Sequence, residues 1–168
     1  MVLGNGTALD PDAILVSVNT VANQLGRGFL RAEYKNTRHG DYEDTSVRPR
    51  EARVTVRPGI HQDGGYFDIQ WWANGDYKYH YREQRLEFRF GCERANESTT
   101  HPVYHFHPPN DLDTHAQSCL DANHPPERVT RAVLASWWGA VRNGDEAVVN
   151  FPTLLPRCYA SQSLRVGL

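Results

Sequence analysis

Apolar residues recur at helical spacing near both ends of the chain. In residues 11–25 they follow Asp10, which can cap a helix, and Pro11, which suits a first turn, and Gly26 ends the pattern. Residues 126–143 begin with a proline, present one apolar face and are followed by Gly144. The sequence therefore predicts helices over about 11–25 and 126–143.

Between these helices apolar and polar residues alternate, as they do in strands with one buried face. Two short runs, GFLRAEYKN and ARVTVRP, flank a polar loop over residues 37–51. Three aromatic runs follow, YFDIQWW, YKYHYR and RLEFRFG, and PVYHFH adds another. Asn74-Gly75 between the first two aromatic runs is a strong hairpin signal. We expect an antiparallel meander over about residues 28–107, followed by a connection in which residues 112–120 favour a turn of helix.

The order helix, strands, helix predicts an α+β fold, in which the N-terminal and C-terminal helices pack mainly on one face of the antiparallel meander sheet. A chain of 168 residues has the length of one domain, so residues 1–168 are expected to fold as a single unit. The tail over residues 144–168 is expected to pack against the body or against a partner.

Composition narrows the class of protein. A net charge of -2 gives no overall attraction to polyanions, so nucleic-acid binding would need a local basic patch. The three cysteines, at 92, 119 and 158, form no C-x-x-C pair, which fits a reducing cytoplasm. No signal peptide and no run of eighteen apolar residues is present, so we expect a cytoplasmic protein without a membrane segment. No cofactor is predicted.

Successive strand residues face opposite sides of a sheet, so the aromatic runs sort their polar residues onto one face. If the aromatic side chains face the helices, the other face collects histidines and basic residues around one carboxylate. This set consists of Lys78, His80, Arg82, Arg85, Glu87, Arg89, His105 and His107. Arginine repels metal cations and binds phosphate well, so this face favours phosphate chemistry.

The first interpretation is metal-independent cleavage of RNA. Imidazoles titrate near neutral pH, so His105 and His107, or His80 and Glu87, could supply the acid and base that the reaction needs. Arg82, Arg85 or Arg89 would stabilise the charge on phosphorus, and Lys78 and His101 would help to bind the substrate.

Three alternatives use the same residues or their neighbours. A metal site could be built from His105 and His107, completed by His101, His115, Cys92 or Cys119. A non-catalytic module could stack bases on aromatic residues, namely Trp71, Trp72, Tyr77, Tyr79 and Tyr81, although such residues more often fill cores. A non-enzymatic protein could recruit a partner through its tail and Trp138.

The middle segment resembles the small toxin family typified by TumE. That family has an aromatic Y-x-Y-H strand, a second strand of the type F-R-Y and a histidine-rich stretch, in this order. The matching positions are Tyr77, Tyr79, His80, Phe88, Arg89, Phe90, His101, Pro102, His105 and His107. The resemblance implies a toxin of a two-component toxin-antitoxin system with a cognate antitoxin as its partner.

Overall fold

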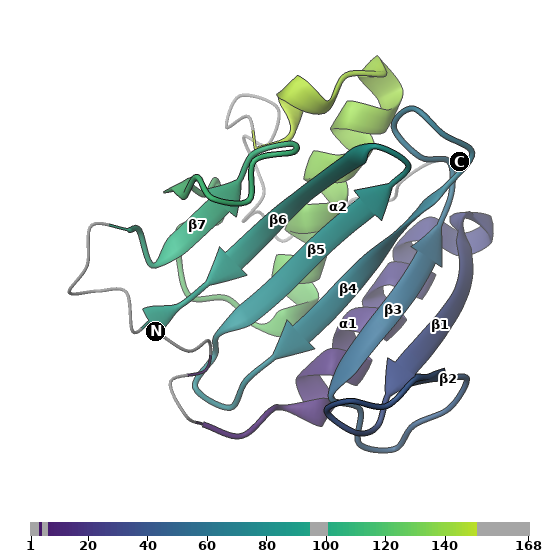
Figure 1. Ribbon diagram of the computed structural model, residues 1–168, viewed down its shortest axis with the longest axis vertical. Helices are drawn as coiled ribbons and strands as arrows, with labels where there is room; N and C mark the ends of the chain where they lie inside the picture. Colours follow the sequence, from purple (N-terminus) through teal and green to yellow (C-terminus); the bar gives the residue numbers. More distant parts are fainter. Residues whose placement is uncertain (1–3, 5–6, 95–100, 151–168) are drawn as a thin grey trace.

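The structure, a computed structural model, describes residues 4, 7–94 and 101–150 (Figure 1). Its two α-helices are α1 (Pro11–Leu25) and α2 (Pro126–Asn143), and both coincide with the predicted ranges. The Asp10 carboxylate accepts a hydrogen bond from the Ala13 amide at 3.0 Å and so caps α1. Gly144, at a φ of 61°, ends α2 in the left-handed conformation that glycine adopts at little cost.

The strands between the helices form one antiparallel sheet. They are β1 (Phe29–Lys35), β2 (Tyr42–Glu43), β3 (Glu51–Val56), β4 (Gly65–Trp71), β5 (Tyr77–Glu83), β6 (Leu86–Cys92), β7 (Tyr104–His107) and β8 (Ala116–Gln117). Their order in the sheet is β2-β1-β3-β4-β5-β6-β7-β8. Short 3-10 helices, η2 (Gly26–Gly28) and η4 (Glu146–Val148), follow the two α-helices. The α+β meander is therefore confirmed.

Two short strands differ from the expectation. Residues 112–120 were predicted to favour a helical turn, but Ala116–Gln117 instead form β8, which pairs with His105 and Phe106 of β7. β2 lies within the polar loop expected over 37–51 and pairs with Tyr34 and Lys35 of β1. Strands of two residues show no alternation, so only their pairing partners reveal them.

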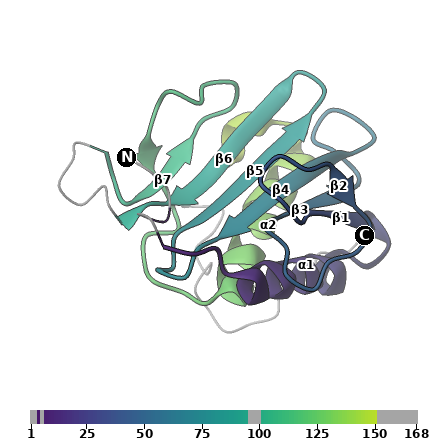
Figure 2. The ribbon, with the colours of Figure 1, turned by 60° about the horizontal axis from the view of Figure 1, so that its bottom comes forward.

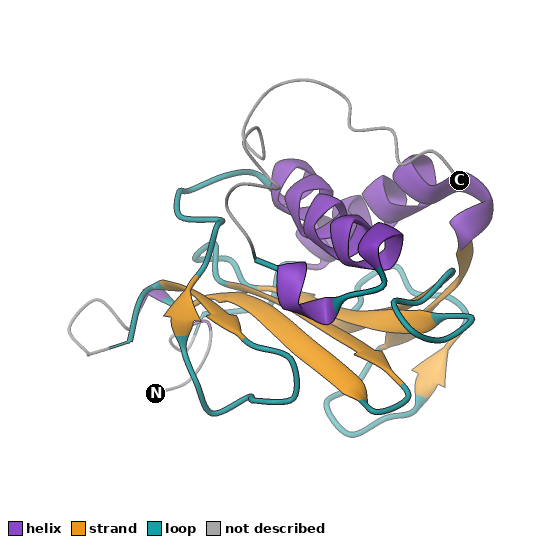
Figure 3. Ribbon diagram, turned by 90° about the horizontal axis from the view of Figure 1, so that it is seen from above, coloured by secondary structure: helices purple, strands orange, loops and turns teal. Residues whose placement is uncertain are grey.

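Both α-helices lie on the same side of the sheet (Figures 2 and 3). α1 packs against β1, β3 and β4, and α2 lies behind β5 and β6 (Figure 1). The buried core between the layers holds the aromatic side of the meander, including Phe67, Trp71, Tyr77, Tyr79, Tyr81, Phe88, Phe90 and Phe106. This burial rules out base stacking on Trp71 and on the three tyrosines of β5.

One hydroxyl group in the core connects the two layers. The Tyr79 hydroxyl, which is fully enclosed, contacts Ser17 of α1 at 3.0 Å and Thr130 of α2 at 2.6 Å, and it accepts a bond from the Trp71 indole at 2.9 Å. One phenol therefore links both helices to the sheet. Trp137 is buried, whereas Trp138 is only partly buried against the core.

Residues 151–168 of the expected tail, with Cys158, lie outside the described residues. The single-domain organisation stays a prediction. Across residues 7–94 and 101–150, no helix has the length and apolar character needed to cross a membrane.

Candidate functional site

The face of the sheet opposite the helices carries a row of titratable side chains, one from each of six neighbouring strands. Residues directly opposite one another in paired strands point to the same side. The register therefore puts Glu33, Arg53, Asp68, His80, Arg89 and His107 on one face in this order. We call this surface the polar face; it is turned toward the viewer in Figure 1.

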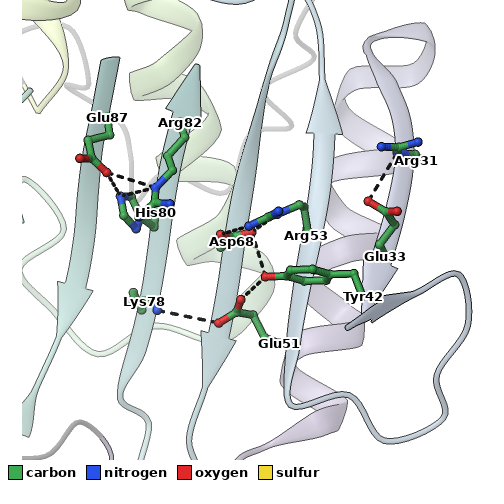
Figure 4. Close-up of polar contacts among 10 residues, drawn as sticks. All are labelled: Arg31, Glu33, Tyr42, Glu51, Arg53, Asp68, Lys78, His80, Arg82 and Glu87. Carbon is green, nitrogen blue, oxygen red and sulfur yellow. Dashed lines mark hydrogen bonds and ion pairs between the residues drawn. The ribbon is translucent and has the colours of Figure 1, made fainter. Parts of the chain in front are cut away.

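At the centre of the polar face, His80 of β5 meets two charged neighbours (Figure 4). Its Nε2 atom lies 2.8 Å from Oε2 of Glu87, and Nε of Arg82 lies 3.1 Å from the same carboxylate oxygen and 3.2 Å from the imidazole nitrogen. Burial lowers the pKa of His80, and the hydrogen bond to Glu87 opposes that shift. An imidazole that contacts a carboxylate beside a guanidinium can accept and release a proton.

Beside this trio, an open hollow of about 680 Å³ lies at the β5–β6 end of the sheet. Tyr66, Arg82, Arg85 and Glu87 are among the residues that line it. Arg85 was expected in a strand, but it occupies the turn between β5 and β6 with a φ of 64°. Asn110 holds that turn, because its side chain donates to the Arg85 carbonyl at 3.0 Å and accepts from the Glu87 amide at 3.0 Å.

Four of the other histidines form a separate cluster over β7. His105 and His107, with 2% and 0% of their surface exposed, have ring centroids 5.0 Å apart. His115 arrives from the loop before β8, with its ring centroid 4.3 Å from that of His107 and 5.2 Å from that of His105. The exposed His101 lies 4.2 Å from His115. The structure therefore brings together four histidines, but away from the trio around His80.

The electrostatics of this cluster keep its buried members neutral. Burial lowers the pKa of His105 to about 4, with a further contribution from His115. Burial and then the Arg89 guanidinium lower the pKa of His107 to about 3. Arg89 approaches His107 with Nη2 2.9 Å from Nε2, so the imidazole accepts a hydrogen bond from the guanidinium.

The cysteines that were considered as metal ligands do not join these histidines. Cys92 follows Phe88 and Phe90 at every second position of β6, so it belongs to the buried core on the helix side. Cys119 packs against the core as well.

One network escaped the sequence analysis. Arg53 binds the Asp68 carboxylate with two hydrogen bonds of 2.8 Å, and its guanidinium lies between the rings of Tyr42 and Tyr66, with centroid distances of 4.3 and 4.2 Å. The Tyr42 hydroxyl also bonds the Glu51 carboxylate, which lies 3.9 Å from Lys78 (Figure 4). Lys78 is therefore engaged within the polar face. The sequence analysis had not considered Arg53 and Asp68, although they are in the alternating runs ARVTVRP and YFDIQWW, from which their side of the sheet could have been read. Tyr42 gave no such signal.

Comparison with known proteins identifies the family. The family model described as "Toxin TumE" matches residues 28–143, which include the whole sheet and α2. No curated protein and no solved structure matches the chain. The matched region extends well beyond the middle segment on which the sequence resemblance rested. By this match over more than half of its length, the chain belongs to the TumE toxin family.

Proposed function

We propose that this toxin cleaves RNA in the hollow beside β5 and β6, with no metal ion in the reaction. The observation that carries the proposal is the contact of His80, Glu87 and Arg82 at the wall of that hollow. A volume of about 680 Å³ is within the usual range for small-ligand sites, so it can admit a nucleotide.

The proposed chemistry begins at Glu87, whose side chain is 35% exposed, whereas that of His80 is 7% exposed. Glu87 therefore contacts the substrate and takes the proton of the ribose 2′-hydroxyl, and His80 behind it shares that proton. The 2′-oxygen forms a bond to phosphorus as the bond to the 5′-oxygen breaks. The leaving oxygen takes a proton from water, which the open hollow admits, and the hydroxide that remains recovers the proton held by Glu87 and His80.

Arg82 and Arg85 stabilise the phosphorane in this scheme. Both line the hollow, and a guanidinium presents paired donors that match the oxygens of a phosphate. The remaining residues predicted to act on RNA do not line the hollow. Arg89 contacts His107, and Lys78 lies near Glu51. The ring of His101 lies against that of His115, and His105 and His107 are buried. We therefore assign proton transfer to Glu87 and His80, and binding to Arg82 and Arg85.

The test uses purified protein and a single-stranded RNA substrate in the presence of EDTA. Glu87→Gln is expected to lower the cleavage rate by about 10²–10⁴-fold, the usual contribution of a general base. Glu33→Gln is the matched control, because Glu33 lies on the same polar face in β1, far along the row from the hollow. Full activity in a folded Glu87→Gln protein would remove this site from the reaction.

A wild-type protein that leaves RNA intact under all conditions would contradict the ribonuclease proposal itself. It would favour the second candidate, a non-enzymatic toxin that binds nucleic acid or a protein through the polar face.

Membership in a toxin family implies an antitoxin partner. We propose that the cognate antitoxin is a protein that acts with this toxin in the cytoplasm, as the cysteine usage suggests. Co-expression with the cognate antitoxin should restore growth that the toxin alone arrests.

A further inference from the structure

The cluster formed by His105, His107 and His115 is outside the reaction proposed above and has the composition of a metal site. One nitrogen from each ring can be chosen so that all three atoms lie within 4.8 Å of one another. Three imidazoles around zinc have nitrogens about 3.4 Å apart, given metal–nitrogen distances of about 2.0–2.1 Å. The nitrogens therefore need to approach one another by at most about 1.4 Å to hold an ion.

His115 is already oriented as a ligand. Its Nδ1 atom lies 3.1 Å from the Asp113 carbonyl, which can only accept, so Nδ1 carries the proton and Nε2 keeps its lone pair. Metal-binding histidines are commonly fixed in this way through their second nitrogen. Asp111 shapes the same loop, because its carboxylate accepts from the Thr114 amide at 3.2 Å and from the Thr114 hydroxyl at 2.7 Å.

The two strand histidines have buried nitrogens that their surroundings satisfy poorly. Nδ1 of His105 and Nδ1 of His107 make no hydrogen bond of good geometry within the described residues. Backbone groups of Pro102 and Val103 lie near the His105 ring, and that of Leu112 lies near the His107 ring. A poorly satisfied buried imidazole costs free energy, and binding of a cation would recover part of it. Room for His105 is provided by Gly91, where an added Cβ would lie 2.5 Å from Nε2 of His105.

One contact opposes metal binding. Arg89 donates to Nε2 of His107. If that nitrogen binds the metal, its lone pair is used; if Nδ1 binds instead, Nε2 carries the proton and can no longer accept. In either case Arg89 loses its acceptor, and its positive charge repels the ion. Metal binding and the contact between Arg89 and His107 are therefore mutually exclusive.

We propose that His105, His107 and His115 bind one divalent transition-metal ion, for which zinc is the natural probe because imidazole suits it. The ion would join the loop before β8 to strand β7 and so fasten residues 108–117 over the polar face. A fourth position would stay open to water or to His101.

Zinc titration of the full-length protein, prepared without a histidine tag, tests the proposal. Wild type should bind one Zn²⁺ per chain and gain thermal stability from it. His115→Ala should weaken binding at least about tenfold, since the loss of even an outer partner of a ligand costs about 10–100-fold. His39→Ala is the matched control, because His39 is exposed in the loop before β2 and should bind like wild type.

Arg89→Met provides a result that misfolding cannot imitate. It removes the competing donor and the repelling charge, so zinc should bind more tightly than to wild type. Co²⁺ bound to wild type should show the visible absorption of a nitrogen-rich site, and His115→Ala should lose it.

Three results would overturn the proposal: no stoichiometric binding to wild type, equal binding by His115→Ala and His39→Ala, or weaker binding by a folded Arg89→Met protein. None of them bears on RNA cleavage in EDTA, so the two proposals fail separately.

Discussion

Gly91 shows how one missing side chain shapes the polar face. It is paired with Lys78 and His105 in the neighbouring strands, so a side chain at this position would point to the polar face. The His105 ring occupies that space instead. A glycine in the middle of a strand usually weakens it, and here the cost is offset by the room that it gives to a buried imidazole.

We predict that Gly91→Ala destabilises the protein by about 1–3 kcal/mol, the usual effect of overpacking, because the new Cβ would overlap His105. The free energy of unfolding, measured by urea denaturation, gives the result. Gly139→Ala is the matched control: nothing lies within 4 Å of its added Cβ, and Gly139 is inside α2. It should stabilise by about 0.5–1 kcal/mol. Wild-type stability for Gly91→Ala would mean that His105 moves freely.

At the scale of elements, the hydrophobic pattern correctly predicted the features that follow from its period. The bounds of α1 and α2 and the sides taken by Tyr79, Phe88 and His80 follow from local spacing. The positions of Tyr42 and His115 could not be predicted, because both are in polar loops and reach the polar face only through tertiary pairing. The separation of His80 from the histidine cluster over β7 could not be predicted either, because it depends on which loop lies over which strand.

Strand β2 has only two residues and is held in part by such tertiary contacts, because its Tyr42 packs on Arg53 of the polar face. Asp68, at 6% exposure, holds Arg53 in place under the Tyr42 ring. We predict that Asp68→Asn lowers the free energy of unfolding by about 1.5–3 kcal/mol, the range for a hydrogen bond to a charged group. Urea denaturation and proteolysis within residues 36–50 should both report the change.

The pair of Arg31 and Glu33, 3.5 Å apart, is the control for Asp68→Asn, because the Arg31 side chain is 66% exposed and that of Glu33 is 21% exposed. Because water screens this pair, Glu33→Gln should cost less than about 1 kcal/mol. If the two substitutions had equal effects, the network around Arg53 would contribute no more than an ordinary surface ion pair.

At the scale of the whole molecule, the two layers leave one face for function. The helices cover one side of the sheet (Figures 1 and 3), and the buried aromatic residues face them. The strand register puts the basic residues expected to act on RNA on the other side, except Arg85 in the turn between β5 and β6. The chain carries a net charge of -2, so RNA binding has to be local to the hollow and sensitive to salt.

We therefore predict that the double substitution Arg82→Gln and Arg85→Gln weakens binding of single-stranded RNA and makes its salt dependence shallower. The plot of log K against log salt should lose about 1.4 in slope, since each phosphate contact to a single strand contributes about 0.7. Arg27→Gln with Arg142→Gln is the charge-matched control, because these exposed arginines lie at the ends of α1 and α2 on the helix side. Fluorescence anisotropy at several salt concentrations measures both. An equal loss in the two double variants would assign RNA binding to overall charge, and the hollow would then lose its role as the binding site.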